Sequence, residues 1–201
     1  MNRSQKLARA ITDVVVRAPF LWPLLRKPMT RLFDQIAPRW DAMTSANRLV
    51  AFEAALEHVP GEPRAVLDLG TGTGDGAIAA ALRWPSADVR AVDVSREMIE
   101  EARRKAPELR FDVGDASALD VPDGAFDLVT MNNVIPFFDE LARVVKPGGH
   151  VLFAFSNGSE TPIYVAPERL RRGLRRTGFD VVRELTTGPG TALVARRQVR
   201  S

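Results

Sequence analysis

Cysteine is absent from this chain of 201 residues, and only two histidines and one tyrosine are present. Without cysteine there can be no disulfide bond, no zinc or iron–sulfur site held by thiolates, and no cysteine nucleophile. No cluster of His, Asp and Glu residues has the spacing of a metal site. We therefore expect no bound metal, and a reaction that does not depend on a thiol.

Long hydrophobic runs are also absent near the start of the chain. The longest uncharged apolar stretch there covers residues 18–25, and eight residues are too few to span a bilayer. The basic start has no long apolar region and no small-residue cleavage site, so no signal peptide is expected. We expect a cytoplasmic protein.

Charge is unevenly distributed along the chain. Residues 1–50 carry nine Lys and Arg against three Asp and Glu, residues 164–201 have the same balance, and residues 51–163 carry ten against nineteen. Basic ends can bind an anionic partner such as nucleic acid, a membrane surface or an acidic substrate. We favour the alternative that they are solvated helix faces. The segment 16–29, which mixes apolar and basic residues, is expected to pack over an active site or a subunit, with peripheral membrane contact as the alternative.

The first third of the chain has helical patterning. Apolar residues at helical spacing predict a helix over residues 4–18, and two further helices are expected at 29–36 and 44–58. Proline fixes φ and removes a hydrogen-bond donor. Regular structure is therefore expected to break at Pro19, Pro23 and Pro28.

From residue 64 onward, strand and helix patterns alternate. Short apolar runs predict strands at 65–69, 89–94, 109–113, 126–131, 150–155, 179–185 and 191–197. Helices are predicted between them at 74–82, 96–105, 137–145 and 167–177. Such alternation with short connections indicates a parallel sheet covered by helices on both faces. The last two strands are close enough to form a hairpin, so one of them must run antiparallel to the rest.

The sequence VLDLGTGTG at residues 66–74 combines the end of a strand, a glycine-rich turn and the start of a helix. Glycine permits positive φ angles and lets a ligand touch the backbone, while a helix N-terminus offers free N–H groups to an anion. Residues 72–77 also fit the dinucleotide pattern G-x-G-x-x-G/A. The loop alone does not decide between cofactors, and a tight turn without a ligand is a further alternative.

One aspartate stands at the end of each of the first three predicted strands: Asp68, Asp93 and Asp115. Because parallel strands end at the same edge of a sheet, these carboxylates are expected along one rim. Asp93, nineteen residues after Gly74, can accept hydrogen bonds from both hydroxyls of a ribose. Asp115 has room to accept from an adenine amino group. Three acids at matching positions predict a binding site rather than ordinary solvated loops.

With these residues in view, the stretch 64–156 resembles the class I S-adenosylmethionine-dependent methyltransferases. The matching segments are VLDLGTGTG at 66–74, VDVS at 92–95 with Met98, VGDA at 113–116, FDLV at 126–129 and LARVVKPGG at 141–149. The last of these is typical of the subgroup that methylates small molecules, including quinone precursors. The segment FDQIAPRWD at 33–41 resembles the entry helix and lid of that subgroup.

The resemblance implies a Rossmann-like α/β fold with seven strands in the order 3-2-1-4-5-7-6. Strand 7 would be antiparallel, and helices would cover both faces. We expect an N-terminal helical extension or lid at 1–58 and an S-adenosylmethionine-binding domain at 59–201. The implied reaction is methyl transfer by in-line displacement to a small acceptor, quinone-like or lipid-like.

The implied cofactor-binding set is Asp68, Gly70, Thr71, Gly72, Gly74, Asp93, Val94, Met98, Asp115, Ala116 and Asn132. The three glycines would bring backbone against the methionine and ribose portions, with Asp68 orienting their loop. Asp93 would hold the ribose hydroxyls.

The remaining members of the set surround the adenine and the reactive sulfur. Val94 and Met98 would lie against the adenine face, and Asp115 with the Ala116 N–H would read the adenine edge. Asn132 would lie near the sulfonium.

The chain departs from the family after Asn132, where residues 133–139 replace a longer loop that often contacts substrate. The acceptor is therefore undetermined. Methyl transfer from a sulfonium needs alignment more than a general base, so no catalytic residue is assigned. Structural roles are favoured for His58 and His150, and packing over substrate contact for Tyr164, Trp40 and Asp41.

Two other functions stay open: an NAD-dependent dehydrogenase with the same glycine loop, and a non-catalytic S-adenosylmethionine-binding module. The terminal hairpin and Asp115 argue against the first, and the complete cofactor motif argues against the second. Nucleic acid is not the expected substrate. A 5-methylcytosine enzyme needs a cysteine, and NNVI at 132–135 stands where amino-methylating enzymes have Asn/Asp-Pro-Pro-aromatic.

Overall fold

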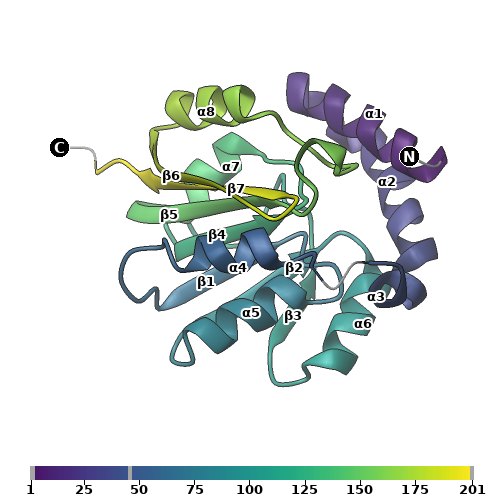
Figure 1. Ribbon diagram of the computed structural model, residues 1–201, viewed down its shortest axis with the longest axis horizontal. Helices are drawn as coiled ribbons and strands as arrows, with labels where there is room; N and C mark the ends of the chain where they lie inside the picture. The colour runs from purple at the N-terminus through teal and green to yellow at the C-terminus, as the bar shows by residue number, and fades with distance from the viewer. Residues whose placement is uncertain (1–2, 45–46, 200–201) are drawn as a thin grey trace.

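The computed structural model describes residues 3–44 and 47–199, and within them seven strands form one sheet in the order β3-β2-β1-β4-β5-β7-β6 (Figure 1). The strands β1 to β5 run parallel, and β7 is antiparallel to both of its neighbours. The strands are Ala65–Leu69 (β1), Asp88–Asp93 (β2), Arg110–Val113 (β3), Phe126–Asn132 (β4), Val145–Phe155 (β5), Phe179–Thr187 (β6) and Gly190–Arg197 (β7). The predicted fold class and strand order are confirmed.

Helices cover both faces of this sheet (Figure 1). Alternate strand residues point to opposite faces, so Val66 packs into one core and Leu67 into the other. The first core is closed by α4 (Val50–Leu56), α5 (Asp75–Arg83) and α6 (Arg96–Lys105). The second is closed by α7 (Phe138–Val144) and α8 (Pro167–Arg176). A short 3-10 turn, η3 (Gly158–Glu160), follows β5.

The N-terminal helices lie over the carboxyl ends of the strands, at the right-hand side of Figure 1. They are α1 (Arg3–Arg17), η1 (Pro19–Leu21), α2 (Trp22–Ile36), η2 (Ala37–Arg39) and α3 (Trp40–Met43). Their apolar faces form a third cluster, which joins Ile11, Val15, Trp22 and Met29 to Ile135 and Ile163 from the loops after β4 and β5. This cluster is what holds the helices on the sheet.

The expectation that Pro23 and Pro28 interrupt regular structure is wrong, because α2 runs through both of them. Pro23 occupies the first turn, where its missing N–H has no helical partner to lose. Pro28 leaves a carbonyl of the preceding turn without its donor. The helix continues because Trp22 and Met29 are buried in the third cluster, and such packing outweighs a local penalty. Pro19, in contrast, does separate α1 from α2 by opening η1.

The helix predicted at 44–58 is shorter in the structure, where α4 covers Val50–Leu56. Its buried residues, among them Phe52 and Leu56, pack into the first core of the sheet. This helix therefore belongs to the packing of the sheet, although it falls within the predicted extension at 1–58. The division of the chain at residues 58 and 59 stays a prediction.

Candidate functional site

The glycine-rich turn between β1 and α5 has the backbone that only glycine adopts readily. Gly70, Gly72 and Gly74 have φ angles of +62°, +56° and +91°. A Cβ atom on Gly70 would lie 2.4 Å from the Val134 side chain, so the loop after β4 leaves no room for a larger residue. A Cβ on Gly74 would instead meet Phe111, in the core. Gly70 and Gly72 thus shape the open side of the turn, and Gly74 permits close packing beneath it.

Asp68, at the end of β1, is buried behind this turn. Burial raises the pKa of its carboxyl to about 6, against the opposing effect of the Thr130 hydroxyl, which donates to Oδ1 at 2.7 Å. A Cβ on Gly76 would stand 2.8 Å from the same carboxylate, so the start of α5 approaches it closely. Asp68 is therefore packed between the turn, the helix and β4.

Asp93, at the end of β2, binds the glycine turn directly. The backbone N–H of Gly72 donates to its Oδ2 at 2.9 Å, and that of Ser95 donates to its Oδ1 at 2.9 Å. Burial raises the pKa of Asp93, although these N–H groups favour the ionised form. Each carboxylate oxygen can accept a further hydrogen bond beside the one from its N–H donor. The Ser95 hydroxyl in turn donates to Asp34 on α2 at 2.6 Å, which links this loop to the N-terminal helices.

Asp115, after β3, is bonded to α2. Trp22 Nε1 donates to its Oδ1 at 2.8 Å and Arg26 donates to its Oδ2 at 2.6 Å, while Ser117 adds its N–H and hydroxyl. Burial alone would raise the pKa of Asp115, but these donors lower it. The sequence motif placed Asp115 at the correct strand end. It gave no sign of Trp22 and Arg26, because these residues are 93 and 89 positions away along the chain.

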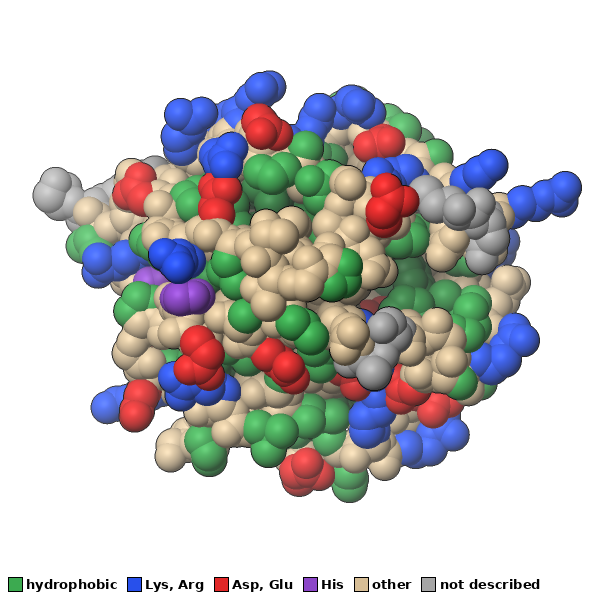
Figure 2. All heavy atoms as spheres, in the orientation of Figure 1, with side chains coloured by type: hydrophobic (Ala, Val, Ile, Leu, Met, Phe, Trp, Pro, Cys, Tyr) green, Lys and Arg blue, Asp and Glu red, His purple; other side chains and the backbone are tan. Residues whose placement is uncertain are grey.

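A cavity of about 560 Å³ lies between these loops and the N-terminal helices. Figure 2 shows a hollow lined by hydrophobic side chains on the side where Figure 1 places α1, α2 and α3. Of the predicted cofactor residues, the cavity is lined by Asp68, Gly70, Thr71, Gly72, Asp93, Val94, Met98, Ala116 and Asn132. Gly74 and Asp115 do not line it. The structure thus brings nine of the eleven predicted residues to one cavity.

The opposite wall of the cavity is apolar. It comes from α2, the helices that follow it, and the loops after β4 and β5: Trp22, Met29, Leu32, Phe33, Ile36, Trp40, Met43, Ile135, Phe137 and Ile163. Trp40 also lies above the glycine turn, with its Nε1 4.0 Å from the position of a Cβ on Gly72. Of these residues, the sequence had singled out Trp22 and Met29, within the segment 16–29 that was expected to pack over an active site, and those within the segment 33–41.

The end of β4 carries two asparagines with different environments. Asn132 lines the cavity, and its buried Oδ1 has no hydrogen-bond partner among the described residues. Asn133 has a φ of +60°, which is uncommon outside glycine. Its side chain holds the end of β5 by donating to the Ser156 Oγ at 2.6 Å and accepting from the Ser156 N–H at 2.9 Å. Asn133 therefore fixes the loop that places Asn132 and Val134 at the cavity.

An ionic network closes the side of the cavity near α3. The carboxylate of Asp41 accepts from the Thr73 hydroxyl of the glycine turn at 2.8 Å and pairs with Lys105 at 2.6 Å. Lys105 and Arg48 also pair with Asp75, at 2.9 and 2.7 Å. The donors to Asp41 lower its pKa although burial acts to raise it. Asp41 is thus a tie between the lid segment and the cofactor loop, a role that the sequence alone did not indicate.

The scarce acid–base residues lie elsewhere. His150 begins the parallel part of β5 opposite Leu128, it does not line the cavity, and burial lowers its pKa. Tyr164 packs edge-on against Phe155 at 5.1 Å and carries Arg9 over its ring at 5.8 Å. Neither residue lines the cavity. Within residues 3–44 and 47–199, no group of three or more His, Cys, Asp or Glu residues could hold a metal ion.

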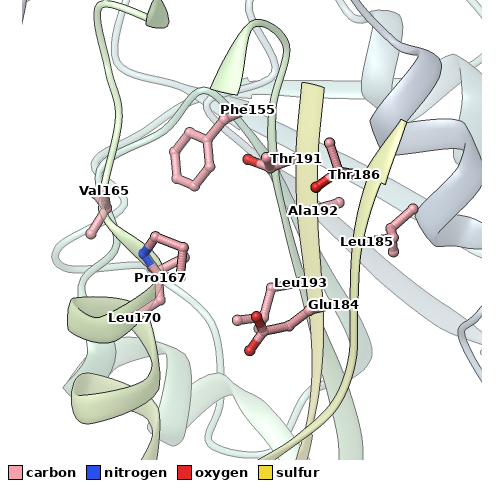
Figure 3. A pocket seen from close by; sticks show the side chains of 10 residues that line it. All are labelled: Phe155, Val165, Pro167, Leu170, Glu184, Leu185, Thr186, Thr191, Ala192 and Leu193. Carbon is pink, nitrogen blue, oxygen red and sulfur yellow. The ribbon is translucent and has the colours of Figure 1, made fainter. Parts of the chain in front are cut away.

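A smaller cavity of about 220 Å³ lies between α8 and the hairpin of β6 and β7 (Figure 3). Its walls are mostly apolar, from Phe155, Val165, Leu170 and Leu193, and its one carboxylate, Glu184, pairs with Arg171. None of the predicted cofactor residues lines it. The site of interest is therefore the larger cavity.

Comparison with known proteins identifies methyltransferases that resemble this chain. Residues 66–149 match a family model described as a methyltransferase domain. A demethylmenaquinone methyltransferase of Thermus thermophilus is 40% identical over 140 residues, which cover 60% of this chain and 62% of the relative. A malonyl-[acyl-carrier protein] O-methyltransferase of Halorhodospira halophila is 38% identical over 148 residues, which cover 68% of this chain and 50% of the relative. The chain thus spans about half to two thirds of the length of these relatives.

A solved structure of a SAM dependent methyltransferase from Aquifex aeolicus has a TM-score of 0.66 and 21% identity, and the match covers 80% of this chain and 97% of that chain. At this identity the likeness shows a shared fold. None of these comparisons favours an NAD-dependent dehydrogenase. The chain therefore carries a methyltransferase domain, and the predicted kinship with the S-adenosylmethionine-dependent methyltransferases is confirmed.

Proposed function

We propose that this chain transfers a methyl group from S-adenosylmethionine to a small apolar acceptor. The observation that carries the proposal is the single cavity in which nine predicted cofactor residues face an apolar wall from the N-terminal helices. Its volume of about 560 Å³ lies within the range of roughly 300–1,000 Å³ that small-molecule sites occupy. One half of the cavity offers hydrogen-bonding groups, and the other half offers a surface for an apolar substrate.

The residues of the polar half fit the cofactor. Gly70 and Gly72 present backbone without side chains, and Asn132, whose buried Oδ1 has no hydrogen-bond partner among the described residues, also lines the cavity. Asp93, already oriented by two N–H groups, is placed to accept the ribose hydroxyls. Met98 and Val94 supply an apolar face for the adenine. When bound, the cofactor would supply a methyl group carried on a positively charged sulfur. In an in-line displacement the acceptor takes this methyl group, and the sulfur keeps the electron pair of the broken bond.

The protein's contribution is alignment and exclusion of water. Near-attack geometry and a closed site account for most of the catalysis such a transfer needs. The apolar wall from Trp22, Phe33 and Ile135 removes water from one side of the cavity, and the glycine turn closes the other. No imidazole lines the cavity within the described residues, so a proton lost by the acceptor passes to solvent or to a carboxylate.

The acceptor class follows from the apolar half. Met29, Leu32, Phe33 and Ile36 form a surface that fits a quinone-like ring or a lipid-like tail better than a polar acyl carrier. The two curated relatives are named for a menaquinone precursor and for a malonyl carrier protein, respectively. Of these two chemistries, the wall of this cavity favours the first.

The N-terminal helices act in this proposal as a lid that must open for exchange. Each tie joins the lid to a different loop of the cofactor site: Asp34 to Ser95, Asp41 to Thr73, and Arg26 to Asp115. Motions of such lids commonly gate substrate entry and product release. Arg9 provides a fourth tie, to the carbonyls of residues 159, 161 and 162 after β5.

Calorimetry tests the cofactor half of the proposal. The purified chain is titrated with S-adenosylmethionine, S-adenosylhomocysteine and NADH, and the titration is repeated on Asp93→Ala. Asp88→Ala is a matched control, because Asp88 starts the same strand and is exposed at its opposite end. We expect both adenosyl compounds to bind the wild type and the Asp88 variant, to bind the Asp93 variant at least tenfold more weakly, and NADH not to bind.

Turnover tests the other half. Phenolic, quinol and lipid acceptors are screened with labelled cofactor, and Met43→Asp is compared with the wild type, because Met43 lines the cavity yet is largely exposed and contributes little to folding. A raised KM for the acceptor with unchanged cofactor affinity is expected. Binding of the cofactor without turnover of any acceptor would favour a non-catalytic module, and NADH binding would favour a dehydrogenase.

A further inference from the structure

The turn between α1 and α2 exposes large apolar side chains. Phe20 is 79% exposed and Leu24 is 75% exposed, and they stand four residues apart, so they project from the same side of the turn. Leu7 and Val14, seven residues apart on α1, are also exposed. Single exposed apolar residues are ordinary on protein surfaces. Several of them on two neighbouring helices indicate a surface that binds a partner.

Phe20 and Leu24 lie opposite the buried face of α2, and Leu7 and Val14 flank the buried face of α1. Ala8, Ile11 and Val15 of α1, and Trp22 and Met29 of α2, are buried in the third cluster. The exposed row is therefore not needed for packing within the chain. The same two helices thus have one apolar face turned toward the cavity and a second apolar row turned toward solvent.

Basic residues flank the exposed row. Arg3, Lys6 and Arg17 are exposed on α1, and Lys27 and Arg31 continue the stripe of Leu24 along α2. From residue 3 to residue 33 the only carboxylate is Asp13. The arginines of α8 at 172, 175 and 176 are exposed as well. Figure 2 shows Lys and Arg side chains, with some Asp and Glu side chains among them, along the upper edge where Figure 1 places α8 and α1.

Apolar side chains among cations, with a single carboxylate between residues 3 and 33, fit the surface of an anionic bilayer. Phe and Leu enter the boundary between headgroups and acyl chains, and Lys and Arg remain with the lipid phosphates. A protein partner of matching shape would need acidic residues around an apolar groove. A second copy of this surface would oppose like charges. No helix within the described residues is long and apolar enough to cross a membrane, so the contact would be with one surface of the bilayer.

We propose that the α1–α2 turn docks on an anionic membrane surface, with Phe20 and Leu24 inserted among the lipids. The cavity lies directly beneath these helices, since Gln5, Ala8, Trp22 and Met29 line it. An apolar acceptor dissolved in the bilayer thus reaches the cavity along the edge of the docked helices. This last step rests on the proposed methyl transfer, whereas the docking itself does not.

Vesicle co-sedimentation of the full chain tests the docking. Vesicles of phosphatidylglycerol mixed with phosphatidylcholine are compared with vesicles of phosphatidylcholine alone, at low and high salt. The variant Phe20→Ser/Leu24→Ser removes the inserted side chains without disturbing the core, because both are exposed. Leu82→Ser on α5 is the matched control, since Leu82 is 77% exposed on a helix that packs on the first core of the sheet and is not part of the α1–α2 surface.

The wild type and the Leu82 variant are expected to bind the anionic vesicles, less strongly at high salt, and to bind the neutral ones at least tenfold more weakly. The Phe20/Leu24 variant should lose about a hundredfold in partition, about tenfold for each of the two large apolar side chains withdrawn from an apolar phase. No binding of the wild type to anionic vesicles, or equal binding by the double variant, would overturn the proposal. A dimer in solution that the double variant dissolves, without vesicle binding, would assign the surface to a second copy.

The cofactor titration separates this proposal from the proposed function. The Phe20/Leu24 variant should bind S-adenosylmethionine with the affinity of the wild type, because neither side chain lines the cavity. Loss of vesicle binding with intact cofactor binding is therefore the expected pattern. Vesicle binding by a chain that binds no cofactor would sustain the docking surface and refute the methyltransferase.

Discussion

Replacing Asp68 by asparagine should stabilise the folded chain without ligand, by an amount that grows with pH. The Asp68 carboxyl is buried, and burial raises its pKa from 3.8 to about 6. The unfolded chain gives up this proton near pH 3.8, whereas the folded chain keeps it until near pH 6. Above that range the fold must hold a buried charge, so stability falls as pH rises through this window. Asparagine has no such charge to bury.

The size of the effect follows from the two pKa values. A difference of about 2.2 between the pKa values of the folded and the unfolded chain corresponds to about 3 kcal/mol in the free energy of unfolding, once the whole range of pH has been crossed. About half of it, roughly 1.4 kcal/mol, develops between about pH 5 and pH 7.5. The Thr130 hydroxyl can donate to an amide oxygen as it does to the carboxylate, so the hydrogen bond to β4 survives the change.

Urea unfolding of both proteins at the two pH values measures the difference. Asp127→Asn is the control, with no pH dependence expected in this range. Burial acts to raise the pKa of Asp127, but Lys146 and the backbone N–H groups of Ala65 and Arg64 lower it below its ordinary value. Asp127 is therefore ionised in the folded and the unfolded chain at both pH values, and the difference between the wild type and this variant should stay constant. A constant difference between wild type and Asp68→Asn, or one that shrinks with pH, would show that the Asp68 anion is stabilised by its surroundings. The burial argument would then be refuted.

Three further predictions concern the glycines at close contacts and the ion pair between α2 and Asp115. Gly70→Ala should lower the free energy of unfolding by about 2 kcal/mol or more, because the backbone has a φ of +62° there and the added Cβ would meet Val134. An unchanged thermal midpoint would contradict this. Gly173→Ala would bring a Cβ to 2.4 Å from the Phe138 ring, so we expect a net loss of about 1 kcal/mol despite the better helix propensity of alanine; a raised midpoint would refute the tight packing of α8 on α7. Arg26→Met removes a donor from Asp115 and should speed hydrogen exchange in α2 relative to α5, and equal protection in both proteins would show that this tie does not hold the lid.

The sheet and its order follow from local patterns and short connections, which is why the sequence predicts them well. The helix boundaries at Arg96 and Lys105, and the first strand at residues 65–69, agree with the structure. The course of α2 through Pro28 could not be predicted in this way. It depends on the burial of Met29 against loops more than a hundred residues further along the chain.

The residues of the candidate site also differ in whether local sequence patterns could predict them. The glycine turn, Asp68 and Asp93 could be located from the sequence because each stands at the end of a predicted strand. The partners of Asp115 and Asp41 could not, because Arg26, Lys105 and Arg48 meet them only after the chain has folded. Side chains of one charge are common on any helix, and nothing in their spacing distinguishes a tie between two segments from a solvated residue.

The lid and the cofactor loops come from separate, contiguous parts of the chain. Met29, Leu32 and Phe33 of the apolar wall all precede residue 44, whereas the glycine turn and the three strand-end aspartates follow residue 64. Under the proposed function, a new acceptor preference can therefore arise largely through change in the first segment, while Ile135, Phe137 and Ile163 supply the part of the wall that follows residue 64. A graft of residues 3–44 between relatives is accordingly a route to new acceptors, provided that the four ties are carried with it.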